Sequence, residues 1–148
     1  MDRTETRYTS REGIGTLTLA HPEIRNALTG TEILDEIITT VEAADSADNV
    51  AVLIITGEGS AFSAGGNVKD MDNGTGLFSG DVGTIAEGYR RTIQRLTATM
   101  ATTDLVTIAA VNGPAIGAGF DLVLGCDLRI GSTNARFAHT FADLGILP

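Results

Sequence analysis

Two glycine-rich turns, each directly after a run of apolar and β-branched residues, constrain this chain more than any other feature. The first run covers residues 50–56 and leads into the glycine-rich segment 57–67, while the second covers 105–111 and leads into 112–121. A continuous run of this kind is typical of a strand buried on both faces of a sheet. Two glycine turns at neighbouring strand ends can aim two backbone N–H groups at one point. Such a pair of donors stabilises negative charge that develops on an oxygen atom.

Strand-like and helix-like segments alternate along the rest of the chain. In chain order we expect a β-hairpin over 5–20, a helix from a capping box at 29–32 to about residue 47, a helix over 85–100, a short helix over 117–125 and short strands at 127–130 and 135–138. The alternation predicts an α/β fold with right-handed crossovers. Because 148 residues suffice for one hydrophobic core, we expect one domain.

The composition excludes several classes of partner. A net charge of −9 argues against nucleic acid, since phosphate binding needs a concentrated basic surface. No apolar run approaches the roughly 18 residues that span a bilayer, and the N-terminus lacks the apolar core of a signal peptide. The lone Cys126 cannot form an internal disulfide, which fits a reducing compartment. We therefore expect a cytoplasmic protein without a membrane partner.

The glycine turns do not match the common nucleotide or hydrolase motifs. The segment that begins at Gly57 and Gly59 has Phe62 where a dinucleotide fingerprint needs its third glycine. The sequence has no phosphate-binding loop of the G-x-x-x-x-G-K-[ST] type and no nucleophile elbow. Two histidines and one cysteine, far apart in sequence, do not form a metal-ligand cluster. We expect no metal site.

Four motifs in order and spacing carry a resemblance to a known family. They occupy residues 22–28 (PEIRNAL), 62–66 (FSAGG), 112–119 (NGPAIGAG) and 126–130 (CDLRI). The chain resembles the crotonase family, also called the enoyl-CoA hydratase/isomerase superfamily, from about residue 5 to residue 148. The resemblance implies an α/β fold of the ClpP/crotonase type, which is a spiral of ββα units. It also implies that residues 1–148 form the core domain and lack the C-terminal helices that complete the family's trimers, so we expect a truncated product.

The resemblance also assigns a binding site. Family members bind an acyl-CoA thioester and hold its oxygen between two backbone N–H groups, which by position belong to Gly66 and Ala118. Small residues let the backbone approach a ligand closely, and Gly117 opens a helix whose N-terminal dipole favours an enolate. The positions expected to contact the CoA and thioester segments are Arg25, Ala27, Leu28, Ala64, Gly65, Gly66, Asn67, Val68, Gly117 and Ala118. No cofactor is implied beyond the CoA moiety of the substrate.

The acid–base positions depart from the family pattern. Hydratases of this family use two carboxylates to activate one water molecule. The first position holds Asp121, whereas the second holds Phe141, which cannot transfer a proton. Asp143 lies two residues further on, a step that in a helix points to roughly the opposite side. His139 is expected to be a surface histidine. Asp121 is therefore the candidate acid–base residue, and two-carboxylate hydration is disfavoured.

The sequence favours an acyl-CoA enzyme that stabilises a thioester enolate. Its candidate reactions are hydration, double-bond isomerisation or another enolate-forming step. Family resemblance places such an enzyme in fatty acid metabolism, as a homotrimer or hexamer. Two alternatives stay open. One is a non-catalytic acyl-CoA-binding homologue that has lost proton transfer at Phe141. The other is an oligomerisation scaffold that keeps the fold and binds no CoA.

Overall fold

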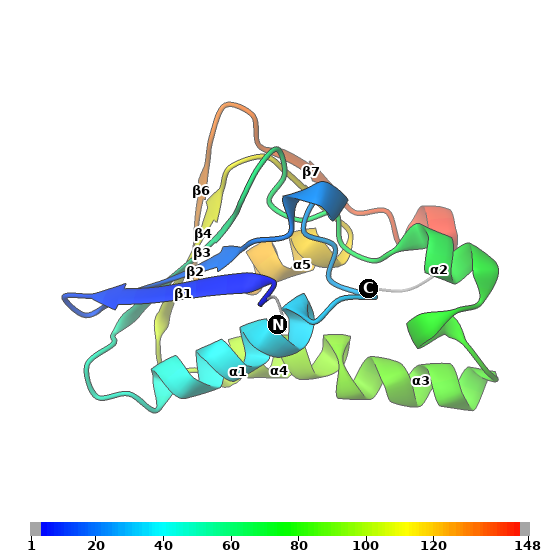
Figure 1. Cartoon of the computed structure of the whole chain (residues 1–148), viewed down its shortest axis with the longest axis horizontal. Coiled ribbons are helices and arrows are strands. Elements are labelled where there is room, and N and C mark those ends of the chain that lie inside the picture. Colours follow the sequence, from blue (N-terminus) through cyan, green and yellow to red (C-terminus); the bar gives the residue numbers. More distant parts are fainter. Residues whose placement is uncertain (1–3, 146–148) are drawn as a thin grey trace.

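A five-stranded sheet in the order β1–β2–β3–β4–β6 forms the centre of the computed structural model, which describes residues 4–145 (Figure 1). β1 and β2 are an antiparallel hairpin, and each later neighbour pairs in parallel. The strands are β1 (Thr6–Arg11), β2 (Ile14–Leu19), β3 (Val52–Gly57), β4 (Val106–Val111) and β6 (Leu128–Gly131). The predicted hairpin, the two apolar strands and the α/β class are thus confirmed.

Helices cover one face of this sheet. α1 (Ile33–Asp45) and α4 (Ile93–Thr102) run beneath it and contact each other, and α5 (Ala118–Leu124) packs on α4 (Figure 1). α3 (Val82–Arg91) extends away from the sheet. β5 (Pro114–Ile116) and β7 (Arg136–Ala138) form a separate parallel pair. The remaining elements are α2 (Val68–Asn73) and three 3₁₀ turns at Pro22–Ile24, Gly76–Phe78 and Ala142–Leu144.

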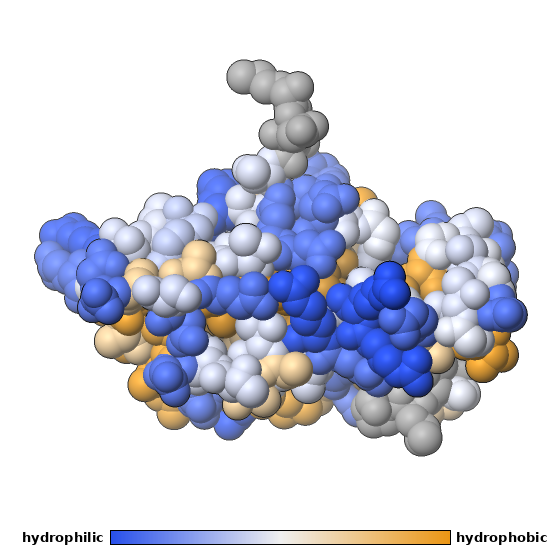
Figure 2. Space-filling view, turned by 90° about the horizontal axis from the view of Figure 1, so that it is seen from below, coloured by the Kyte–Doolittle hydropathy of each residue, from blue (hydrophilic) through white to orange (hydrophobic). Residues whose placement is uncertain are grey.

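The core lies between the sheet and the helices. Leu53 and Ile55 of β3 are fully buried, and each buried aliphatic side chain of this size contributes about 1.5–3 kcal/mol. The neighbours Val52 and Ile54 are only half-buried. Within the described part of the chain, the expectation that this strand is buried on both faces is therefore wrong, because the helices cover only one face. Figure 2, which looks at the molecule from the helix side, shows hydrophilic residues across the middle of that face and hydrophobic residues along its lower edge.

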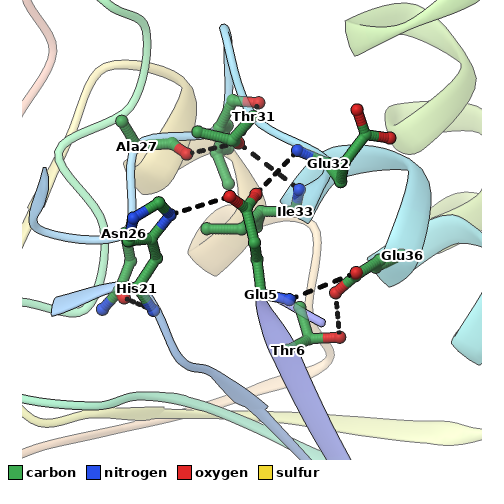
Figure 3. A network of polar contacts seen from close by, with 10 residues as sticks. Glu5, Thr6, His21, Asn26, Ala27, Thr31, Glu32, Ile33 and Glu36 are labelled. Carbon is green, nitrogen blue, oxygen red and sulfur yellow. Dashed lines mark hydrogen bonds and ion pairs between the residues drawn. The ribbon is translucent and has the colours of Figure 1, made fainter. Parts of the chain in front are cut away.

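The capping box predicted at the start of α1 is also wrong. Glu32 occupies the N-cap but its side chain makes no capping hydrogen bond. The hydroxyl of Thr29 instead accepts the N–H of Asn67, 38 residues away, at 2.7 Å. The Glu5 carboxylate, at the start of the hairpin, accepts the Glu32 N–H at 2.7 Å and its other oxygen lies 2.9 Å from His21 Nδ1 (Figure 3). The latter contact has the distance of an ion pair but not the alignment of a hydrogen bond.

The single helix predicted over 85–100 is two helices that meet at Thr92. This residue has φ −116° and ψ −89°, outside the helical range, and serves as the boundary of α3 and α4. Its hydroxyl and its N–H both donate to the carbonyl of Gly88, at 2.8 Å and 3.1 Å, and back-bonding of this kind by threonine often bends a helix. The apolar face continues across the break, which explains why periodicity alone did not locate it. None of the helices within residues 4–145 has the length and apolar character needed to cross a membrane.

Candidate active site

The first glycine turn leaves one backbone donor without a partner. Among residues 63–67, the structure gives an acceptor within the described chain to every N–H except that of Gly66. The four acceptors are the carbonyls of Pro114 and Arg25, the hydroxyl of Ser63 and the hydroxyl of Thr29, which bind the N–H groups of Ser63, Ala64, Gly65 and Asn67 respectively.

The segment 25–29 holds this turn in place. Leu28 donates its N–H to the Gly65 carbonyl at 2.8 Å, and Ala27 forms a parallel bridge with Gly65. Asn26 is fully buried, with φ +54°, and its side-chain NH₂ lies 3.1 Å from the carbonyls of Glu58, Ala61 and Phe62. Its side-chain oxygen accepts the His21 N–H at 2.9 Å. A buried amide with these partners fixes the path of the chain into the turn.

The second glycine turn packs directly on the first. Ile116 donates its N–H to the Ser63 carbonyl at 3.0 Å, and Gly117 donates to the Ala138 carbonyl at 2.9 Å. Gly65 has φ +77°, and a Cβ there would lie 2.2 Å from the Ile116 carbonyl oxygen and 3.1 Å from the Ala118 nitrogen. Only glycine fits this contact.

The N–H of Ala118 is the second donor without a partner. Ala118 is the first residue of α5, where an N–H has no acceptor within its own helix, and none of the described residues accepts it. Gly66 and Ala118 line the same cavity of about 260 Å³. Its wall is mainly apolar and also includes Ala64, Val68, Met71, Tyr89, Ile93, Ile116, Gly117, Thr140, Phe141 and Asp143. Two unpaired donors in apolar surroundings can stabilise an oxyanion more strongly than water does.

Two further cavities adjoin this one. A cavity of about 690 Å³ shares Tyr89, Ile93, Ala118 and Phe141 with it and is also lined by Leu28, Leu122 and Asp121. Burial raises the pKa of Tyr89, so the phenol stays neutral at physiological pH. On another side, a cavity of about 300 Å³ shares Ala64 and Ile116 and reaches Arg25.

The predicted CoA-contact positions therefore divide into two groups. Some line the cavities, namely Arg25, Leu28, Ala64, Gly66, Val68, Gly117 and Ala118. The others support the turn. Ala27 and Gly65 pair through their backbones, and the Asn67 side chain caps α2 by accepting the Lys69 N–H and donates to Asp70 at 2.8 Å.

Asp121 and His139 form a pair that the sequence did not indicate. Asp121 Oδ1 lies 2.9 Å from His139 Nε2, with the side chains 30% and 40% exposed. The imidazole ring contacts Phe120 and Phe141, with ring centroids 6.0 Å and 4.9 Å apart. His139 is exposed, as expected, but its contact with Asp121 was not expected. The 18 residues that separate the pair carry no periodic signal, so only the docking of β7 beside β5 brings them together.

The sequence predicted that Asp143 points away from Phe141, and this prediction is wrong. Both residues line the cavity that contains Gly66 and Ala118. Residues Ala142–Leu144 form a 3₁₀ turn, and Phe141 is its N-cap. With about three residues per turn, a two-residue step no longer reverses the side-chain direction as it does in an α-helix. Within residues 4–145 there is no group of three or more side chains suited to hold a metal ion.

Comparisons with known proteins identify the family of this chain. The family profile for enoyl-CoA hydratase/isomerase matches residues 9–148, and the chain belongs to that family. It is 35% identical to 2,3-dehydroadipyl-CoA hydratase of Escherichia coli over 132 residues. The matched segment covers 89% of this chain and 48% of the relative. It is 29% identical over 135 residues to 4-chlorobenzoyl coenzyme A dehalogenase-1 of an Arthrobacter species, covering 91% and 48%.

A solved structure of an enoyl-CoA hydratase has the same fold as this chain. The structure of enoyl-CoA hydratase subunit I from Geobacillus kaustophilus superposes with a TM-score of 0.83 at 32% identity, covering 98% of this chain and 52% of that one. The crotonase fold expected from the sequence is confirmed. The chain spans about half the length of the curated relatives that it matches.

Proposed function

We propose that this protein is an acyl-CoA enzyme of the hydratase or isomerase type. It binds the thioester oxygen between the N–H groups of Gly66 and Ala118 and stabilises the enolate that forms there. The observation that carries the proposal is that these two donors, 52 residues apart in sequence, both lack acceptors in the described chain and line one cavity. In comparable sites, one such donor contributes about 2.7–4 kcal/mol to the transition state.

The adjoining cavities suit the rest of an acyl-CoA. The acyl group fits the apolar 690 Å³ cavity beside Leu28 and Leu122. The pantetheine arm passes Ala64 toward Arg25, whose guanidinium is suited to a phosphate group. The relatives support this substrate class, since the hydratase and the dehalogenase are each named after a CoA thioester. A trimeric or hexameric assembly, a role in fatty acid metabolism, a cytoplasmic location and the lack of any other cofactor stay predictions.

Titration with a β-ketoacyl-CoA tests the proposal directly, because a working oxyanion hole shifts this ligand toward its ultraviolet-absorbing enolate. The expected result is a saturable enolate band. Ala118→Pro removes one donor at the first helical position, where proline is well tolerated, and should abolish the band. Val82→Pro, which places proline at the first position of the exposed helix α3, is the matched control and should keep it.

Phe141 in the cavity wall favours one alternative, a non-catalytic acyl-CoA-binding homologue. That protein would bind the β-ketoacyl-CoA saturably without producing the enolate band. An oligomerisation scaffold would not bind the ligand at all. Either result would overturn the proposed enolate chemistry, and circular dichroism of each variant shows whether it is folded.

A further inference from the structure

We propose that Asp121 and His139 act together as the proton-transferring unit of this site. Asp121 is the catalytic base, and His139 is a positioning residue that orients the Asp121 carboxylate. This inference rests on the proposed function, because it requires an enolate held by Gly66 and Ala118. Phe141 cannot supply a second carboxylate, so the reaction we infer uses Asp121 as the one proton-transferring side chain.

Asp121 stands on the same face of α5 as the oxyanion donor. It follows Ala118 by three residues, a spacing that places side chains on one side of a helix. Both residues line the 690 Å³ cavity. A thioester whose oxygen is bound at the Ala118 N–H therefore has its α-carbon on the side of the helix that carries the carboxylate.

His139 contacts that carboxylate from outside the cavity lining. A carboxylate only accepts hydrogen bonds, so the 2.9 Å contact requires a proton on His139 Nε2. The rings of Phe120 and Phe141 flank the imidazole. Asp121 lines the 690 Å³ cavity, whereas His139, which is 40% exposed, does not.

The transfer needs no other reactant. Asp121 takes the proton from the α-carbon as the C–H bond breaks, and the electron pair of that bond becomes the enolate stabilised by Gly66 and Ala118. Asp121, which is 30% exposed, exchanges this proton with solvent and then delivers a proton to carbon, and the carbonyl re-forms. His139 keeps its Nε2 proton throughout. A proton that leaves carbon and returns to carbon needs one carboxylate, whereas activating water needs a second group that Phe141 cannot provide.

The hydrogen bond from His139 orients the Asp121 carboxylate toward the bound thioester. Two other polar side chains lie on neighbouring elements, Asp143 of the 3₁₀ turn and Tyr89 of α3. The guanidinium groups of Arg129 and Arg136 bond to backbone carbonyls of Cys126 and Ala135.

The test is deuterium incorporation at the α-carbon of 3-butenoyl-CoA in D₂O, followed by mass spectrometry with the 148-residue chain. Wild-type protein should incorporate deuterium. Asp121→Asn should reduce the rate by about 100-fold or more. His139→Gln keeps a hydrogen-bond donor to Asp121, so its rate should stay within about tenfold of the wild-type rate.

The other histidine provides the matched control. His21→Gln should leave the rate unchanged, because His21 contacts Glu5 and not Asp121. His139→Ala loses the donor and should exchange more slowly than His139→Gln. An unchanged rate in His139→Ala would overturn the inference, as would equal rates in His139→Ala and His139→Gln.

The enolate band separates this failure from failure of the proposed function. A wild-type protein that produces the band but does not exchange the α-proton has an oxyanion hole and no Asp121–His139 base, which overturns only the present inference. A wild-type protein without the band has lost the proposed function itself, and this inference is overturned with it.

Discussion

The hydroxyl of Ser63 donates to the Asn26 carbonyl at 2.7 Å and accepts the Gly65 N–H at 3.1 Å. Ser63 is fully buried and so is Asn26. One hydroxyl therefore connects the segment after β2 to the residue that precedes the Gly66 donor. The turn that carries the Gly66 N–H is held by side chains that do not themselves line the 260 Å³ cavity.

Ser63→Ala is expected to destabilise the fold by about 1–3 kcal/mol, since it leaves a buried carbonyl and a buried N–H without partners. It should also weaken the enolate band of a bound β-ketoacyl-CoA. Ser132 is a matched control because its hydroxyl also donates to a carbonyl, that of Asn112, and accepts an N–H, that of Asn134, at an exposed position. Ser132→Ala should change the unfolding free energy by no more than about 0.5 kcal/mol. Equal effects in urea unfolding would contradict the role of burial.

Gly65→Ala should abolish the enolate band, because its Cβ would meet the Ile116 carbonyl oxygen at 2.2 Å and force the two turns apart. Gly13→Ala controls for backbone strain alone. Gly13 has φ +84°, close to the +77° of Gly65, and a Cβ there meets nothing within 4 Å. Both variants should lower the thermal unfolding midpoint, but only Gly65→Ala should lose the band. Loss of the band in both would show that the contact between the turns is not what matters.

Asp127 should make the fold depend on pH in acid. Hydrogen bonds from the backbone N–H and the hydroxyl of Thr107, both at 2.8 Å, lower the pKa of Asp127 from its ordinary value of 3.8. A lowered pKa means that this stabilisation is fully present above pH 3.8 and is lost as pH falls through the folded-state value.

Asp127→Asn should therefore be less stable than wild type near neutral pH, and the difference should shrink in acid. Urea unfolding of both proteins at several pH values measures it. A double-mutant cycle with Thr107→Val assigns the effect to this pair. A difference that stays constant between neutral pH and pH 2 would contradict the assignment.

Cys126 should be unreactive in the folded protein. Burial, followed by the charge of Asp127, raises the pKa of this thiol to about 12. The reactive thiolate is then scarce at pH 8. Iodoacetamide should modify the native chain far more slowly than the urea-unfolded chain, as mass spectrometry would show. Similar rates in the two states would mean that the thiol is accessible.

The sequence predicts the fold well because the decisive signals are local. The apolar runs that became β3 and β4, and the amphipathic pattern that became α1, follow from spacing within one segment. The failures involve partners distant in sequence. Thr29 is a residue type that often caps helices. Its hydroxyl instead accepts the N–H of Asn67, which lies in the loop after β3.

The candidate site divides in the same way. Gly66 and Ala118 could be placed on one cavity from motif positions, because glycine turns after neighbouring parallel strands meet at one edge of a sheet. The Asp121–His139 contact and the direction of Asp143 could not, since both depend on how β7 and the following 3₁₀ turn pack. Tertiary packing, which no local pattern encodes, decided those positions.

The arrangement of the two turns also determines when the site comes into existence during folding. Gly66 follows β3, Ala118 follows β5, and the segment that supports them follows β2. The two donors and their support therefore come from three separate segments of the chain. The donors meet only after pairings of high contact order have formed, which are the slow steps of folding. The amplitude of an enolate band would therefore measure the fraction of completely folded molecules. A tightly bound thioester would shift the folding equilibrium toward these molecules by mass action.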